Sequence, residues 1–445
     1  MAKAKVPTPA EIAGMWQASG LKEKLIFTFL MIAVFRLGTH LPIFGINHAA
    51  LEHVGNQNLL GFLDLFSGGA LSKVSIFALG IGPYITSSII MQLLSSIVPH
   101  FENLQKQEGE AGRRKLAQYT RVFSVVLAFF QSTVFMLFLS NQHGLLISTV
   151  SRPLFIVESA LAMTAGSMLI MWIAELITER GIGNGASLLI FVGILSRIPY
   201  YSSTTWTQVS HDPGKIIGLL VLLAIYIATI FLIVIMQEAI RKVIIINAKR
   251  QVGNKVYGGV NTFIPFKLNP GGVMPIIFTV AIMIFPRTVF EAISKSPQLG
   301  HSVVGNIASF INNTLLDPNG IYYYIIYFTL IVVLTFFYAS IVPSMQPKEI
   351  ANNLKKYGSS IPGIKPGKPT ADVIDKILSR TTFIGAVGLG VIALVPNLAT
   401  YFTQITTLQG LGATALIIMV GVGLDFINQI KVHLLARQYE GFLKQ

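Results

Sequence analysis

Long runs of apolar residues, separated by shorter polar stretches, repeat along the chain. A helix that crosses a bilayer needs roughly 20 mostly apolar residues, and backbone polar groups in lipid must be hydrogen-bonded within their own segment. The pattern therefore predicts an all-α integral membrane protein. We expect ten transmembrane helices, the fifth of them short, near residues 25–43, 77–95, 119–139, 154–176, 184–199, 216–238, 272–290, 320–342, 379–396 and 411–430.

One apolar stretch is too short to cross a bilayer. Residues 62–73 read FLDLFSGGALSK, and Ser67-Gly68-Gly69 interrupts them shortly before the second span. Glycine is poorly tolerated inside a helix because it has the greatest backbone freedom to lose. The pattern therefore predicts a broken half-helix that leaves water without crossing the membrane.

Composition supports a membrane protein and removes several kinds of chemistry. Hydrophobic residues make up 53% of the 445, charged residues make up 12%, and the mean hydropathy is +0.65. A soluble chain of this length needs more polar surface. Cysteine is absent and the eight histidines show no HxxH or HExxH spacing, which removes disulfides, thiolates and the common metal motifs. We expect no cofactor and no enzymatic activity.

The basic residues are distributed unevenly between the two sides of the predicted spans. Of the 33 lysines and arginines, 26 lie in segments on one side, 6 lie on the other, and Arg36 lies inside the first span. By the positive-inside rule, the richer side is cytoplasmic, and both termini lie there. This topology explains most of the net charge of +14 without a nucleic-acid partner. The basic N-terminal stretch precedes an apolar run that we interpret as a retained span, not a cleaved signal peptide.

Ten spans divide into two groups of five, which we assign to an N-terminal half (residues 1–200) and a C-terminal half (residues 201–445). An odd number of spans in each half gives the halves opposite orientations, as in inverted repeats. The second span of each half begins with a Gly/Pro interruption, LGIGPYI at 79–85 and GGVMPII at 271–277. Matched interruptions favour a pathway between the halves, although Pro83 and Pro275 could instead merely kink packed helices.

Charges inside the predicted spans are sparse: they are Arg36, Glu158, Glu175 and Asp425, and most of them lie towards span ends. Ion-coupled transporters usually carry ionisable residues near the membrane midplane. In this chain, the midplane residues of the second, fifth, seventh and ninth predicted spans are Ile, Leu, Val and Ala. A passive conduit is the favoured interpretation. An inverted-repeat secondary transporter of a small solute is the main alternative, and a membrane-embedded enzyme is a third.

Two long cytoplasmic loops, near residues 240–270 and 343–378, hold much of the positive charge. In the first, Gly253-Asn254 between β-prone runs predicts a hairpin with a two-residue turn. The second contains Pro-Gly turns at 362–363 and 366–367. Turns that display basic residues favour docking on an acidic partner, including ribosomal RNA phosphates, against the alternative of ordinary solvated loops. The candidate docking residues are Arg241, Lys242, Lys249, Arg250, Lys255, Lys365 and Lys368.

Five sequence runs, spread over nearly the whole chain, resemble the SecY/Sec61-alpha family, the channel-forming subunits of the Sec protein translocase. They are FSGGALSKVSIFALGIGPYI (66–85), EGEAGRRKLAQYTR (108–121), ITERGIGNG (177–185), AKRQVGNKVYGG (248–259) and NNLKKYGSSIPGIKPG (352–367). The resemblance implies a protein-conducting channel with a central pore. It would pass unfolded secretory polypeptides across the membrane and release transmembrane segments laterally into lipid.

The resemblance also assigns roles to particular residues. Residues near 60–74 would be the plug, a short re-entrant helix that closes the pore, with Phe62, Leu63, Leu65, Phe66, Ser67, Gly68, Gly69 and Leu71. An aliphatic pore ring would consist of Ile81, Ile85, Ile190, Ile277 and Val395. The second and seventh spans would form a lateral gate that includes Pro83, Ser87, Pro275 and Ile276.

The partners that the resemblance implies are the SecE and SecG subunits, the SecA ATPase, the ribosome, signal-bearing polypeptides and membrane lipids, and the implied location is the bacterial inner membrane. Four residues at three places depart from the family pattern. Lys365 replaces an arginine in the PGIRPG turn and loses its bidentate fork. Asn254-Lys255 replaces a pair of arginines at the hairpin tip, and Val395 replaces isoleucine in the ring.

Overall fold

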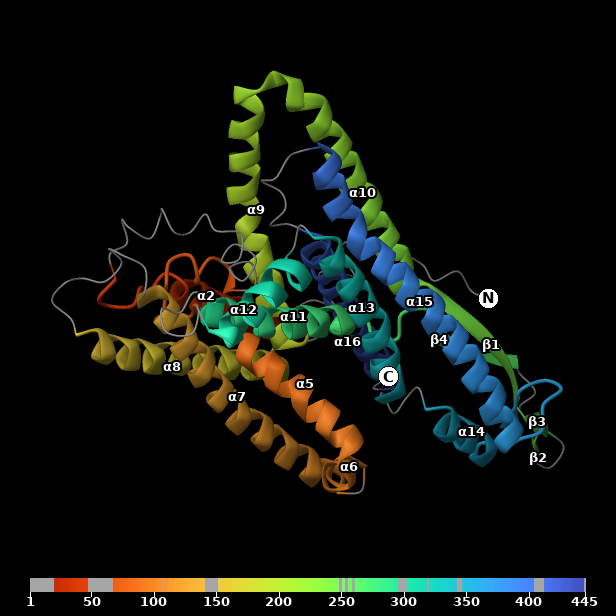
Figure 1. The fold of residues 1–445 in the computed structure, drawn as a ribbon. Helices are drawn as coiled ribbons and strands as arrows, with labels where there is room; N and C mark the ends of the chain where they lie inside the picture. Colours follow the sequence, from red (N-terminus) through yellow and green to blue (C-terminus); the bar gives the residue numbers. More distant parts are fainter. Residues whose placement is uncertain are drawn as a thin grey trace. The chain divides into compact units, whose positions relative to one another are not determined.

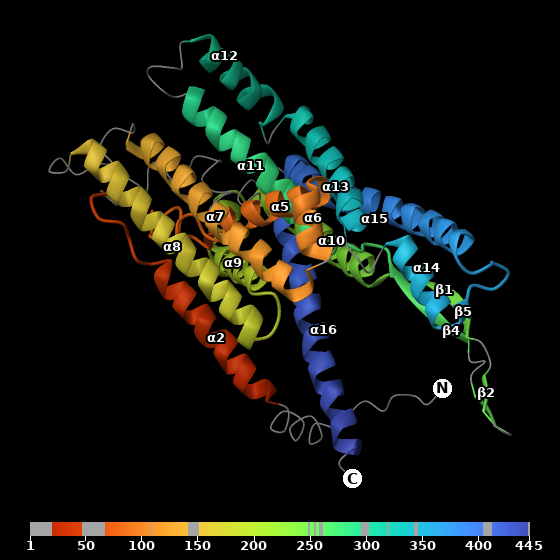
Figure 2. The same cartoon turned by 90° about the horizontal axis from the view of Figure 1, so that it is seen from below.

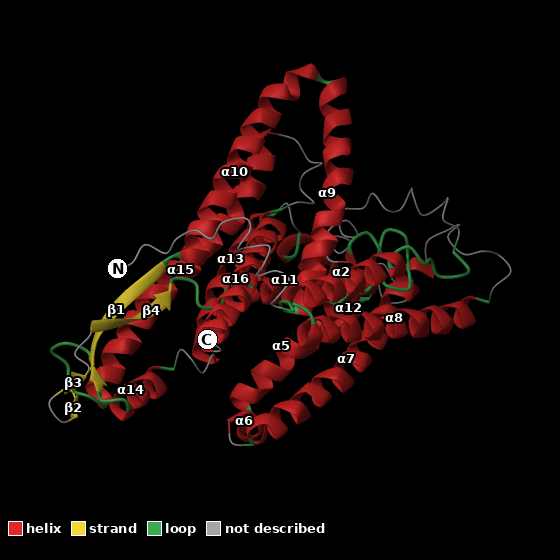
Figure 3. Cartoon of the chain, turned by 180° about the vertical axis from the view of Figure 1, so that it is seen from behind, coloured by secondary structure: helices red, strands yellow, loops and turns green. Residues whose placement is uncertain are grey.

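The structure, a computed structural model, describes residues 20–46, 67–106, 108–140, 151–247, 250–252, 255–257, 261–294, 302–317, 320–341, 346–403 and 412–443. Helices dominate the described residues, and the named strands fall within 240–267 and 359–360 (Figure 3). Seven of the described helices are long and apolar enough to cross a membrane. The prediction of a helical membrane protein is confirmed.

The chain forms two compact units. The first unit comprises residues 1–206, 288–308 and 418–445, and the second comprises residues 207–287 and 309–417. Each is described below by itself. The division into sequence halves at residue 200 stays a prediction.

The first unit is built around α2 (Leu21–Gly38), α5 (Gly82–Ile97), α6 (Pro99–Lys106), α7 (Gly109–Ser140), α8 (Arg152–Arg180) and the first part of α9 (Gly185–His211). α8 packs between α2 and α7, and α7 also contacts α5 and α6 (Figure 2). Small residues at every fourth position of α7, including Ser124, Ala128 and Ser132, are fully buried. Small side chains let helices approach closely in membrane proteins, and the Ser132 hydroxyl donates to the Ala160 carbonyl of α8 at 3.1 Å.

The GIGNG run at 181–185 connects α8 to α9 by a tight turn. The Ile182 amide donates to the Thr28 hydroxyl of α2 at 3.2 Å, and the Gly185 amide donates to the Thr178 hydroxyl at 2.9 Å. Ile182 is also packed with Leu21 of α2 and with apolar residues of α16 (Ala413–Leu443). The turn is therefore a packed joint between helices.

The second unit contains η1 (Pro213–Lys215), α10 (Ile216–Glu238), α11 (Met274–Ser294) up to residue 287, η2 (Ile311–Leu315), α13 (Ile321–Ile341), α14 (Pro347–Lys356) and α15 (Lys368–Thr403); α12 (Val303–Phe310) and α16 are each divided between the units. α15 runs beside α10 and also packs on α13 (Figure 1). Glycines on α15 permit both approaches, because Gly388 faces Met236 of α10 and Gly390 faces Phe328 of α13.

The strands of the second unit come from both long basic loops, near residues 240–270 and 343–378. β1 (Ile240–Asn247) pairs with β4 (Asn261–Lys267) and with β5 (Ser359–Ser360), in the order β4-β1-β5. β2 (Arg250–Val252) pairs with β3 (Lys255–Tyr257), and the Val252–Lys255 pair leaves Gly253-Asn254 as a two-residue connection. The predicted hairpin is confirmed. The longer β1–β4 ribbon and β5 were not predicted.

Each of the ten predicted spans overlaps one helix of the structure, but several bounds differ. The second predicted span begins at residue 77, whereas α5 begins at Gly82 after a series of turns. The fifth was expected to be short, yet α9 has 27 residues. That expectation was wrong because helical hydrogen bonding continues past the apolar run into polar residues, which a hydropathy window does not register. The count of ten spans stays a prediction.

Candidate functional site

The segment before α5 is a series of turns. Residues 68–81 adopt turn conformations apart from one isolated bridge at Ser75, and Gly68 (φ 66°) and Gly69 (φ 93°) occupy the left-handed region. That region favours glycine because it lacks a Cβ atom. Ser67, Gly68, Gly69 and Leu71 are all buried. The other four predicted plug residues, Phe62, Leu63, Leu65 and Phe66, lie outside the described residues, and the plug helix stays a prediction.

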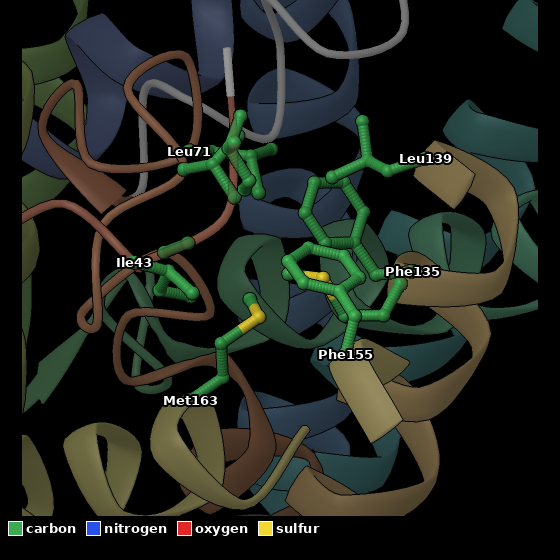
Figure 4. Packing of buried hydrophobic residues seen from close by; sticks show 10 residues of the cluster. Ile43, Leu71, Phe135, Leu139, Phe155 and Met163 are labelled. Carbon is green, nitrogen blue, oxygen red and sulfur yellow. The ribbon is translucent and has the colours of Figure 1, made fainter. Parts of the chain in front are cut away.

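The later part of this segment is anchored by backbone bonds and by apolar packing. The Ile43 amide donates to the Val74 carbonyl at 3.1 Å, and the Ile76 amide donates to the Leu41 carbonyl at 3.0 Å. Leu71 and Val74 belong to a buried cluster with Ile43, Phe135, Leu139, Phe155 and Met163 (Figure 4). Residues 71–76 are therefore fixed to the core of the first unit.

Two arginines also hold the segment, Arg36 at Gly68 and Arg197 at Ser72. Arg36 Nη1 donates to the Gly68 carbonyl at 2.8 Å and to Ser196 Oγ at 3.0 Å. Arg197 Nη2 donates to Ser72 Oγ at 2.8 Å. The sequence interpretation counted Arg36 among the few charges inside the spans and gave Arg197 no role. The available signal was an arginine within an apolar span, in a chain that also carries a Ser-Gly-Gly run whose glycines have no side chain to cover their backbone carbonyls.

The five predicted pore-ring residues are distributed over both units. In the first unit, Ile81 is the buried N-cap of α5, Ile85 follows one turn later and is half-buried, and Ile190 is buried on α9. In the second unit, Ile277 is buried on α11 and Val395 is half-buried on α15. Ile81 and Ile85 lie on one helical face because the Ile85 amide donates to the Ile81 carbonyl. Assembly of all five into a ring stays a prediction.

The predicted gate residues begin α5 and α11. Pro83 is buried in the first turn of α5, and the fully buried Ser87 donates its hydroxyl to the Thr120 carbonyl of α7 at 2.7 Å. In the second unit, Pro275 and Ile276 are buried in the first turn of α11. The Asn269 side chain donates to the Gly272 carbonyl at 2.7 Å, which fixes the turn that precedes this helix. Both Gly/Pro runs are therefore sites where a helix begins; the gate itself stays a prediction.

Charged groups form few arrangements suited to chemistry. Arg121 of α7 pairs with Glu175 of α8 at 2.8 Å, which joins two helices of the first unit. Among the described residues, no group of three or more His, Asp or Glu side chains could hold a metal ion. The arrangement suits packing of helices.

The two long loops that the sequence predicts to be cytoplasmic share one hydrophobic core. Val243, Phe266, Leu354, Ile361, Ile374 and Leu378 are buried together beneath the β4-β1-β5 sheet, α14 and the start of α15. Ser359 Oγ donates to Asn247 Oδ1 at 2.7 Å, where β5 meets β1. Residues distant in the chain therefore form one folded body.

The predicted docking residues lie on this body where the structure describes them. Arg241 and Lys242 are exposed on β1, and Lys242 Nζ lies 4.9 Å from the centre of the Phe263 ring. Lys365 and Lys368 are exposed, and the Thr370 hydroxyl donates to the Lys365 carbonyl at 2.8 Å, which ties the turn to α15. Arg250 and Lys255 pair with residues of the hairpin through their backbones. Lys249 lies outside the described residues.

Comparisons with known proteins agree with this architecture. The SecY family model matches residues 75–427. The protein translocase subunit SecY of Synechococcus elongatus is 43% identical over 454 aligned positions, which cover 100% of this chain and 99% of that protein.

Solved structures share the fold at lower identity. A protein conducting channel matches with a TM-score of 0.67 and 18% identity, covering 98% of this chain and 95% of that one. The channel in the canine ribosome-channel complex from the endoplasmic reticulum matches with a TM-score of 0.63 and 17% identity over the same shares of the two chains. The match to the family model and the full-length identity establish that this chain belongs to the SecY family.

Proposed function

We propose that this chain is the protein-conducting channel of a Sec translocase. Unfolded secretory polypeptides pass through it across the membrane, and apolar transmembrane segments leave it sideways into lipid. The observation that carries the proposal is the identity of 43% along the full length of a protein named protein translocase subunit SecY. The main alternative, an inverted-repeat solute transporter, is not favoured by these relatives.

The chain is a multi-pass helical membrane protein. We assign it ten spans in two inverted halves, residues 1–200 and 201–445, in a bacterial inner membrane with both termini cytoplasmic. The supporting observations are the overlap of every predicted span with a helix and the concentration of basic residues on one side.

The proposed pore ring consists of Ile81, Ile85, Ile190, Ile277 and Val395. Aliphatic constrictions can close to water and ions by dewetting, and they offer a passing polypeptide no polar group to bind. A ring of this chemistry therefore suits a substrate of variable sequence. The plug closes the pore on the outer side at rest, and residues 67–71 form its described part.

The proposed lateral gate lies between the helices that begin at Gly82 and Met274. A signal helix that leaves through it transfers its apolar side chains into lipid, and each buried large side chain contributes about 1.5–3 kcal/mol. Pro83 and Pro275 lie where these helices begin and are packed within their own units. Opening would then involve relative movement of preformed helix ends.

The proposed partners bind the cytoplasmic body or the membrane helices. The ribosome or the SecA ATPase docks on the exposed basic residues of the sheet and turns, and SecE and SecG pack against the spans. A ribosome complex of a channel with this fold supports the first assignment. The shared core of the two loops supports docking because it holds basic residues of both loops on one body.

Reversal of two basic charges on β1 tests the docking surface. We expect Arg241→Glu combined with Lys242→Glu to weaken ribosome or SecA binding by about tenfold or more, and to reduce its salt dependence, since phosphate contacts release counterions. Arg113→Glu with Arg114→Glu changes the net charge equally on α7 and should have little effect. Cosedimentation at two salt concentrations measures both. Equal weakening by the two pairs would mean that only net charge matters.

A crosslink tests the proposed pathway directly. The chain contains no cysteine, so a single Ile277→Cys provides a unique thiol, to be oxidised against a cysteine in a stalled secretory chain. We expect a crosslink only when the secretory chain has a functional signal sequence. A crosslink at the lipid-facing control Ile227→Cys (68% exposed) in place of Ile277→Cys would reject the ring assignment.

A further inference from the structure

The carbonyl of Gly68 is bound by side chains of two different helices. Arg36 of α2 reaches it at 2.8 Å, and the same nitrogen also donates to Ser196 Oγ of α9 at 3.0 Å. Ser196 Oγ lies 3.4 Å from the Gly68 carbonyl and donates to the Gly193 carbonyl at 2.7 Å. The segment, α2 and α9 therefore meet at one polar junction.

The backbone fits this junction closely. A Cβ atom on Gly68 would lie 2.9 Å from the Gly193 Cα and 3.1 Å from Arg36 Nη1, and one on Gly69 would lie 3.3 Å from the Arg197 guanidinium. Both glycines also have positive φ. A side chain at either position would push the segment away from α9.

Two kinds of contact divide the segment at Ala70. On the C-terminal side, Leu71 and Val74 are buried in an apolar cluster and residues 74–76 are bridged to 41–43. On the N-terminal side, hydrogen bonds from Arg36 and Ser196 hold the Gly68 carbonyl to α2 and α9. Hydrogen bonds to a charged group are directional and are lost when the groups separate by little more than an ångström, whereas apolar burial is non-directional.

We propose that Arg36, together with Ser196, is the positioning contact that holds residues 67–69 in the resting channel, and that the segment pivots about the anchored residues 71–75. Arg197, through Ser72, steadies the pivot. The inference rests on the proposed function, since it supposes that residues 67–69 move when a polypeptide enters. Breaking the Arg36 contacts releases the front of the segment without unpacking the core behind it.

The test compares two arginines of the same unit. Arg36→Gln removes the guanidinium at the junction, whereas Arg152→Gln removes one at the start of α8 that donates to Ser140 Oγ at 3.3 Å. The full chain, with its partner subunits, is purified and reconstituted in liposomes. Hydrogen exchange of the peptide that covers residues 67–71 and ion leakage without a translocating chain are measured for each.

We expect Arg36→Gln to accelerate exchange at residues 67–71 by about tenfold or more and to raise the resting leak, because the loss of a bond to a charged donor has that effect on a local equilibrium. Exchange at residues 76–81 should not change. Arg36→Lys should restore part of the protection, and Ser196→Ala should give a smaller change in the same direction.

The proposal would be overturned if Arg36→Gln matched Arg152→Gln in both measurements. Should Arg36→Gln fail to fold, Ser196→Ala decides the question, since a wild-type exchange rate in that variant would also reject the junction. Failure of the proposed function is distinguishable, because the wild-type liposomes would then not translocate a signal-bearing precursor, while hydrogen exchange would still report the contact.

Discussion

Replacement of Phe266 by alanine is expected to unfold both long basic loops while the membrane helices stay intact. Phe266 is only 2% exposed. It lies in the buried hydrophobic cluster that joins β1, β4, α14 and the start of α15. Removal of a buried phenylalanine costs about 3–5 kcal/mol. A small three-stranded sheet has little other burial to offset that loss. Trypsin cleavage within the loops should therefore accelerate by about a hundredfold or more.

Phe263→Ala provides the matched control from the same strand. Side chains alternate between the two faces of a strand, so Phe263, three residues before Phe266, points to the opposite face. Phe263 is 49% exposed there. The Lys242 ammonium group lies over its ring at 4.9 Å, and an exposed cation–π contact of this kind contributes about 0.5–1 kcal/mol. Limited trypsinolysis of proteoliposomes, resolved by mass spectrometry, compares the two variants. Equal cleavage rates would show that the loops do not share a core.

The shared core places the basic residues of both loops on one folded body. Arg241 and Lys242 belong to the first loop, and Lys365 and Lys368 belong to the second, but one folded body carries all four. A rigid body presents its charges to a partner with less loss of conformational entropy than two separate loops would. Phe266→Ala should therefore weaken partner binding as well, although no charge has changed.

Local chemistry explains which of these strands could be predicted. The Gly253-Asn254 dipeptide is a local sequence signal for a two-residue turn, and the strands on either side of it, β2 and β3, pair with each other. β5 has two residues, and its partner Ile246–Asn247 lies more than a hundred positions earlier in the chain. No local pattern marks such a pairing, because it depends on burial of Ile361 and Leu354 in the common core.

The same distinction applies to the membrane helices and the site. A segment in lipid must be an apolar helix to satisfy its backbone groups, so hydropathy can predict where membrane helices occur. It does not predict their ends, since α9 continues beyond the apolar run and α15 begins at Lys368, well before it. Arg36 was visible as a charge in an apolar run, but its acceptor, the Gly68 carbonyl, is a backbone atom that any residue would carry. Only the folded geometry identifies it.

Gly385→Ala is expected to strain the connection between the β4-β1-β5 sheet and α11. A Cβ atom at this position of α15 would overlap the carbonyl oxygen of Leu268. That carbonyl has little room to move, because the Leu268 amide donates to the Ala239 carbonyl at 2.8 Å and the adjacent Asn269 side chain binds the Gly272 carbonyl. α11 begins a few residues later and carries Ile277. The strain therefore acts on a proposed pore residue.

Gly423→Ala on α16 is the control, since a Cβ atom there would meet no atom within 4 Å. Alanine gains about 1 kcal/mol of helix propensity over glycine in each variant, so the difference between the variants isolates the overlap. We expect Gly385→Ala to have the lower free energy of unfolding by about 1–3 kcal/mol, measured by thermal denaturation in detergent, and to slow precursor translocation. Equal stability of the two variants would mean that the Leu268 carbonyl can yield, and the sheet would then not constrain the start of α11.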